Sequence, residues 1–376
     1  MILKKAFCKI NNWIRLNVPL WARILYIFTL CSVVVYVIAV NDVDFADFIN
    51  EYPAAYFRAV YSKMTGVFPF SVAELVIYFL PVILGMLIYR VIKLSRENKD
   101  REITRMFAGT FAVLSIFFSF FVFTHGTGYR GSTLEDRLGL ERNKVSARQL
   151  YRTAEYILNE MNEEAEKIKF DEDGFSVMPY NFAEMSYKLN EAYARVCEDY
   201  TFILSYTSNV KPVLASKIMS YAHVLGVYTY YTGEANVNID FPDYTTPFTA
   251  AHEMSHQRGF SREDEANFMA YLVCINSDDG YIRYSGYRNM FEYIMNALYS
   301  ADKEMYREIY LRQNKNIQAE LKAYREFFKQ YENNVVADVS NKVNDAYISM
   351  NGQSAGIRSY GLVVDLMVAY FERVHG

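Results

Sequence analysis

Two histidines, His252 and His256, lie four residues apart, and Glu253 follows the first of them. On a helix, side chains four residues apart project from the same face, so both imidazoles can reach one metal ion. The H-E-x-x-H spacing is typical of zinc hydrolases, in which the histidines bind Zn²⁺ and the glutamate is the general base for a metal-activated water. The sequence therefore predicts Zn²⁺ as cofactor, His252 and His256 as metal ligands, and Glu253 as the catalytic residue.

A catalytic zinc site needs a third protein ligand, and two carboxylates follow the motif. Gly259 extends it to H-E-x-x-H-x-x-G, but Arg262 stands where a metzincin has histidine or aspartate, which excludes that class. Glu263 and Glu265 lie about 200° apart on a helix, so only one of them can face the metal. We expect Glu263 to be the ligand, because small residues on its face permit close packing; Glu265 is the alternative. Asn267, one turn after Glu263, is expected to orient a ligand by a hydrogen bond.

The residues around the motif predict the elements that position it. Thr246 is expected as the helix N-cap, with Pro247 at the first helical position and Gly259 after the C-terminus. Upstream, residues 227–239 are rich in strand formers around a central turn, which predicts a short strand or hairpin. A strand in this place could pair with an extended substrate, so it is the suspected substrate-binding element. A purely structural hairpin is the alternative.

Most of the remaining sequence predicts helices. Apolar residues recur at helical spacing over residues 146–168, 182–204, 211–226, 281–300, 301–332 and 359–374. The expected fold class is therefore mainly α, with N-terminal transmembrane helices followed by a zincin-like α+β domain that has a small sheet.

Three apolar segments near the N-terminus approach the roughly 20 residues that span a bilayer, namely residues 24–40, 72–89 and 106–124. Basic residues precede the first segment and fill the loop after the second, so both regions are expected in the cytoplasm. Residues 1–125 are thus predicted to be a multi-pass membrane anchor in the cell membrane, and residues 126–376 an extracytoplasmic domain. The first segment lacks a clear cleavage site, which favours a retained anchor over a cleaved signal peptide.

Composition limits the partners. A net charge of −4 gives no reason to expect nucleic acid. Cys197 and Cys274, the two cysteines after residue 125, could form a disulfide or remain free thiols, and the sequence leaves both open. It also leaves the oligomeric state open.

Residues 252–272, which read H-E-M-S-H-Q-R-G-F-S-R-E-D-E-A-N-F-M-A-Y-L, resemble the bacterial membrane family catalogued as domain of unknown function 3810. The resemblance extends over nearly the whole chain, including residues 359–366, and implies membrane helices and an exported zincin-like metallopeptidase domain without a known substrate. A looser resemblance to the ImmA/IrrE and Ste24/HtpX-like peptidases implies that Glu263 binds zinc with Asn267 as its polar partner. Two differences from those families are the shorter interval between His256 and Glu263 and the asparagine in place of the Ste24-like aspartate.

Together these features predict a membrane-anchored zinc metallopeptidase that hydrolyses peptide bonds outside the cytoplasm, with a peptide or protein substrate and the lipid bilayer as partners. One alternative is a non-enzymatic membrane receptor or assembly factor with a structural zinc site, although a structural site has no need of Glu253. The other is a zinc hydrolase of non-peptide, cell-wall amides. The strand before the motif favours an extended peptide.

Overall fold

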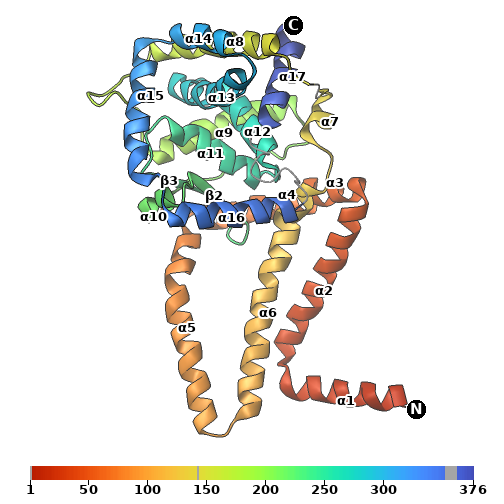
Figure 1. Cartoon of the computed structure of the whole chain (residues 1–376). Coiled ribbons are helices and arrows are strands. Elements are labelled where there is room, and N and C mark those ends of the chain that lie inside the picture. The colour runs from red at the N-terminus through yellow and green to blue at the C-terminus, as the bar shows by residue number, and fades with distance from the viewer. Residues whose placement is uncertain (1, 142–143, 352–361) are drawn as a thin grey trace.

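The computed structural model describes residues 2–141, 144–351 and 362–376, which form a globular body above long, separate helices (Figure 1). The predicted composition is confirmed: the described residues are mainly helical and contain a three-stranded sheet. The N-terminal helix α1 (Ile2–Asn17) lies at the end of the long helices that is far from the body.

Three helices extend from the base of the body, α2 (Leu20–Asn41), α5 (Val72–Arg96) and α6 (Asp100–Thr124). Each is long and apolar enough to cross a membrane, and they contain the three segments predicted from the sequence. No residue in the most apolar window of α5 is buried inside the protein. An apolar surface of this extent fits association with a membrane.

Two shorter helices connect α2 to α5 at the base of the body, α3 (Val43–Glu51) and α4 (Pro53–Gly66). Arg58 of α4 is buried, and its guanidinium donates hydrogen bonds to Asn50 and to the carbonyl oxygens of Thr124 and Arg258. Residues 42–66, which were predicted to be part of the membrane anchor, therefore pack against the globular body.

The start of α5 is also tied to the body. Ser71 accepts a hydrogen bond from the Glu74 N–H and so caps the helix. The Glu74 carboxylate accepts hydrogen bonds from the N–H groups of Leu214 and Ala215. These contacts hold the start of a long apolar helix against the residues that directly follow the first strand of the sheet, Lys211–Val213.

The sheet has the order β1-β3-β2, from strands β1 (Lys211–Val213), β2 (Gly226–Thr229) and β3 (Glu234–Asn238). Strands β2 and β3 form an antiparallel hairpin, so the hairpin predicted over residues 227–239 is confirmed. The helix predicted over residues 211–226 is wrong, because β1 pairs in parallel with β3 and only α10 (Ser216–Tyr221) is helical. The pairing of β1 with a strand distant in the sequence outweighs the helical pattern of the local residues. Shortly after α10 ends, His223 has a φ of 57°.

The body is built mainly from helices. Besides α10, the described helices after α6 are, in chain order, η1 (Gly126–Tyr129), α7 (Leu134–Leu138), α8 (Ala147–Ala165), α9 (Phe182–Asp199), α11 (Thr245–Gln257), α12 (Glu263–Ile275), α13 (Gly280–Ala301), α14 (Lys303–Leu311), α15 (Lys315–Phe328), η2 (Lys329–Tyr331), α16 (Val335–Met350) and α17 (Val363–His375). The single helix predicted over residues 301–332 is divided, because Asp302 and Asn314 cap two successive helices, α14 and α15. Helix α16 was not predicted, and residues 359–361 of the predicted last helix lie outside the described residues.

Helices α11 and α12 are almost entirely buried in the core of the body. The predicted N-cap at Thr246 and the first helical position for Pro247 are both wrong, because α11 begins at Thr245 without a side-chain cap and Pro247 is its third residue. The Phe248 N–H donates instead to the Ser285 hydroxyl of α13. Cys197 and Cys274 are free thiols, so the disulfide alternative is wrong.

Candidate metal centre

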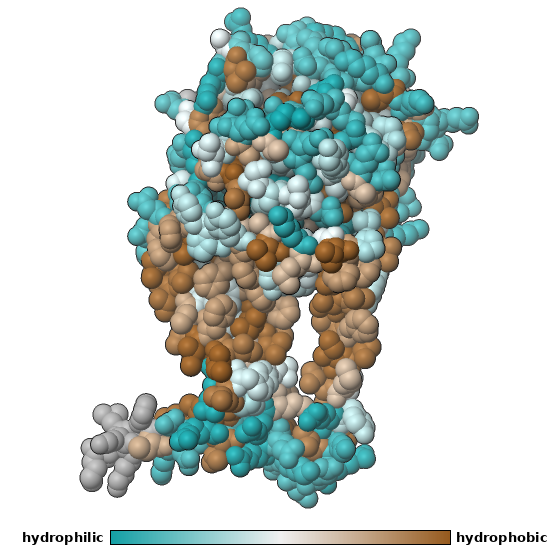
Figure 2. Space-filling model, turned by 180° about the vertical axis from the view of Figure 1, so that it is seen from behind, coloured by the Kyte–Doolittle hydropathy of each residue, from teal (hydrophilic) through white to brown (hydrophobic). Residues whose placement is uncertain are grey.

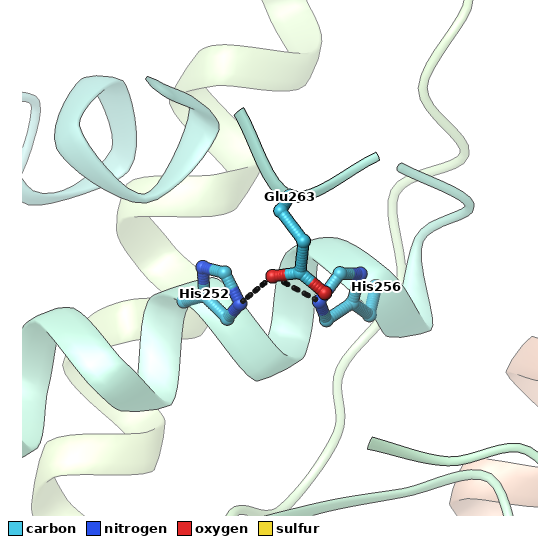
Figure 3. Close-up of side chains that lie close together, drawn as sticks. All are labelled: His252, His256 and Glu263. Carbon is cyan, nitrogen blue, oxygen red and sulfur yellow. Dashed lines mark ion pairs between the residues drawn. The ribbon is translucent and has the colours of Figure 1, made fainter. Parts of the chain in front are cut away.

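Helices α11 and α12 bring two histidines and a glutamate together (Figure 3). A Glu263 carboxylate oxygen lies 3.4 Å from His252 Nε2 and 3.8 Å from His256 Nε2. One possible ligand atom from each of the three residues lies within 4.8 Å of the other two. Two imidazole nitrogens and one carboxylate oxygen are a donor set that suits Zn²⁺. Metal binding itself stays a prediction.

The turn between the two helices explains how Glu263 reaches the histidines. Gly259 has a φ of 102°, a left-handed conformation that favours glycine, and it reverses the chain directly after α11. A Cβ atom at this position would also collide with the Arg58 guanidinium. Glu263 is the first residue of α12, so its side chain projects back over the face of α11 that carries His252 and His256.

The second carboxylate, Glu265, has other partners. It accepts a hydrogen bond from the Leu134 N–H and forms an ion pair with Arg262 at 2.8 Å. Both Glu265 and Arg262 are buried to a large extent, so this pair fixes the start of α7 against α12. Of the two carboxylates left open by the sequence, the structure brings Glu263 to the histidines and places Glu265 elsewhere.

Each histidine is held through its Nδ1 atom. His252 Nδ1 lies 3.1 Å from Asn267 Oδ1, and His256 Nδ1 lies 2.7 Å from the Phe260 carbonyl oxygen. Because both oxygens are acceptors, the protonated Nδ1 donates and the Nε2 lone pair is left for a metal ion. Asn267, predicted to orient a ligand, thus contacts His252.

The charges of the three residues are strongly coupled. Burial favours the neutral imidazole of His256, but the nearby Glu263 and Glu253 carboxylates outweigh it and raise the pKa of His256 to about 9. Burial likewise opposes ionisation of Glu263, yet the two imidazoles hold its pKa far below the ordinary value. Without a bound cation, a proton on His256 therefore balances the Glu263 carboxylate, and a metal ion would replace that positive charge.

Glu253 lies between the motif helix and the sheet, with 4% of its surface exposed. It packs so closely against Gly226 of β2 that a Cβ atom there would lie 2.5 Å from Glu253 Oε1. Burial raises the pKa of the Glu253 carboxyl, while His252 and His256 act in the opposite direction. Among the residues that the structure describes, strand β2 is at the edge of the sheet and pairs with β3 alone, so the predicted base lies beside an edge strand.

His125 is a neighbour of the site that sequence reasoning missed. Its ring centroid lies 5.5 Å from that of His256, and the Ser261 hydroxyl donates a hydrogen bond to its carbonyl oxygen. Burial, together with the charges of His256 and Arg58, lowers the pKa of His125 well below 6.5, so its ring is neutral. One feature of the sequence could have pointed to His125: it is one of only five histidines, and it directly follows the third apolar segment. His223, in contrast, contacts the Tyr331 carbonyl oxygen.

Comparison with known proteins identifies one matching family. The family model described as "Protein of unknown function (DUF3810)" matches residues 51–368, which include α11, α12 and the sheet. No curated protein and no solved structure matches the chain. The family resemblance found in the sequence is confirmed, and because the match covers most of its length, the chain belongs to the DUF3810 family of proteins of unknown function.

Proposed function

We propose that this protein is a membrane-anchored zinc metallopeptidase in which His252, His256 and Glu263 hold Zn²⁺. The observation that carries the proposal is the convergence of these three donors from two packed helices. The Nδ1 hydrogen bonds of both histidines add support, because they leave each Nε2 free to bind the metal.

The chemistry follows from the donors and from Glu253. Zinc bound by these residues would act as a Lewis acid that polarises a carbonyl group and acidifies water. Glu253 is adjacent to the first ligand, buried, and has a raised pKa, which suits a group that must both accept and donate a proton. In the proposed reaction Glu253 takes a proton from the attacking water and passes it to the leaving amine as the peptide bond breaks.

Strand β2 supports a peptide as substrate. An extended peptide can add to an edge strand through backbone hydrogen bonds, and β2 is such a strand. Gly226 of this strand contacts Glu253, so a peptide bound along β2 would have its backbone close to the base. This arrangement favours a peptide over a non-peptide amide of the cell wall.

A receptor or assembly factor with a structural zinc site is the alternative from another class. Structural zinc sites have four protein ligands, whereas the cluster found among the described residues has three. A structural site also gives no reason to bury a carboxylate beside the ligands, as Glu253 is. Both features favour catalysis.

We further propose that α2, α5 and α6 cross the cell membrane, with the N-terminus in the cytoplasm and the body outside. The basic residues of α1 and of the α5–α6 loop support this orientation by the positive-inside rule. Reporter fusions after residue 98 and at residue 376 would test it. An enzyme that reports only outside the cytoplasm should be active at residue 376 and inactive after residue 98.

The function is tested with the full chain purified in detergent, by measuring zinc content and the turnover of a peptide library. We expect about one zinc per chain, turnover by the wild type, and loss of turnover with zinc retained in Glu253→Gln. Glu263→Gln should lose zinc, and its matched control Glu265→Gln should keep it. A wild-type protein that binds no zinc would refute the proposal. Zinc with hydrolysis of cell-wall amides but not of peptides would favour that alternative.

A further inference from the structure

We propose that α16 is a membrane-interface helix: its exposed apolar face lies in the outer lipid surface, and the helix covers the metal centre from the bilayer side. The proposed partner is a lipid bilayer.

The surface of α16 has three sectors. Five large apolar residues, each between 51 and 77% exposed, share one sector of the helix: Val335, Val336, Val339, Val343 and Met350. At 3.6 residues per turn they fall within about 100° of the circumference. A second sector packs on the protein through the buried residues Ala337 and Ile348. The third sector is polar and exposed and carries Asp338, Lys342 and Asp345. An exposed apolar sector that lies between a sector packed on the protein and a polar sector is typical of helices that lie in a membrane interface.

The position of α16 matches this role. It lies along the base of the body, at the level where α5 and α6 leave it (Figure 1). Before its first turn, Tyr331 donates a hydrogen bond to Asp240, and its carbonyl oxygen contacts His223 Nε2. Near its last turn, the ring of Tyr347 lies 6.2 Å from that of Phe121 in α6. Contacts at both ends thus hold α16 across the base of the body.

The neighbouring elements have exposed apolar residues as well. On α4, Tyr56, Val60 and Met64 recur every four residues and are all exposed. Leu214 and Ile218, before and within α10, are also exposed. Figure 2 shows hydrophobic residues along the lower edge of the body that continue onto the long helices. This continuity favours lipid over a protein partner, because a docking site for one protein would be a separate patch rather than an extension of the apolar helices.

A short series of aromatic contacts links α16 to the metal centre. The ring centroid of Tyr347 lies 6.4 Å from that of Tyr129, Tyr129 lies 5.2 Å from His125, and His125 lies 5.5 Å from His256. The metal centre is therefore only a few side chains above the bilayer-facing helix. A peptide that enters from this side would come from the membrane surface; this consequence rests on the proposed function, whereas lipid contact by α16 does not.

The test uses the full chain in proteoliposomes, with Cys8, Cys31 and Cys197 replaced by serine and one new cysteine labelled with an environment-sensitive fluorophore. Val343→Cys probes the apolar sector, and Ser349→Cys is the matched control on the exposed polar sector of the same helix. A nitroxide carried on lipid should quench the fluorophore at residue 343 about threefold more than at residue 349. Val339→Cys repeats the measurement if Val343→Cys does not fold.

Equal quenching at residues 343 and 349, or none at either, would overturn the proposal. If lipid does not quench the labelled protein, and unlabelled Val343→Cys forms a disulfide between two copies under oxidation, the proposal would be overturned in favour of a second copy of this chain. Vesicles that contain the wild-type protein then receive a soluble and a lipid-tethered form of one peptide, and we expect the tethered form to be cleaved faster. Quenching as expected with neither peptide cleaved would refute the peptidase function and leave the lipid contact of α16 intact.

Discussion

The sharpest test of the role of Glu253 is to substitute the residue that it packs against in the sheet, by Gly226→Ala. Gly226 lies in β2, and its φ is not in the left-handed region, so alanine fits the backbone. The added Cβ would lie 2.5 Å from Glu253 Oε1 and 2.8 Å from both Glu253 Cγ and Thr249 Cγ2. No atom of the three proposed zinc ligands is among the nearest atoms. The substitution is therefore expected to displace the proposed base and to leave the proposed ligands in place.

The size of the effect follows from these distances. Ordinary contacts of a Cβ atom begin at 3.4 Å, so Glu253 Oε1 must move by about 0.9 Å. A displacement of about 1 Å of a catalytic group can reduce a rate by about 100-fold. Overpacking of this kind costs about 1–3 kcal/mol of stability, which a body of this size tolerates. We expect kcat to fall by about 100-fold while zinc content stays at the wild-type value.

The assay compares zinc content, melting temperature, kcat and KM of the wild type, Gly226→Ala and Gly85→Ala. Gly85 in α5 is the matched control, because nothing lies within 4 Å of a Cβ added there. Gly85→Ala should behave as the wild type in all four measurements. If folded Gly226→Ala retained wild-type kcat, the contact with Gly226 would not position the base and the reasoning would be refuted.

Three further predictions concern the surroundings of the ligands. Asn267→Ala should weaken zinc binding by about 10–100-fold, since His252 loses the partner of its Nδ1 atom; chelator competition measures this, and unchanged affinity would contradict it. Glu265→Ala should lower the free energy of unfolding by about 3 kcal/mol, measured by thermal unfolding, because Arg262 and the Leu134 N–H lose a buried partner. Its zinc content should stay unchanged, and a loss of zinc would instead indicate that Glu265 is a ligand. Zinc binding should release a proton from His256 below pH 9, because its raised pKa keeps the metal-free site protonated. The affinity for zinc should therefore rise about tenfold per pH unit up to pH 9 and level off above it. A zinc affinity that does not change between pH 7 and 9 would contradict this.

Much of the local structure could be predicted because it depends on neighbours in the sequence. The three long apolar helices follow from runs of hydrophobic residues, and helix α8 follows from the helical spacing of its apolar residues. The β2–β3 hairpin lies where strand formers flank a turn. Prediction failed where distant residues compete with local preference, as at β1, which pairs with β3 although its own segment has a helical pattern.

The sequence by itself determined the pairing of His252 with His256, because their spacing sets one face of one helix whatever surrounds it. It favoured Glu263 over Glu265 without excluding either, since the position of each carboxylate depends on the turn at Gly259 and on Arg262 and the Leu134 N–H, which bind Glu265. Only the tertiary structure brought His125 from the end of α6 to within a ring contact of His256. Helical spacing is a property of a few consecutive residues, whereas these contacts exist only once segments far apart in the chain have packed together.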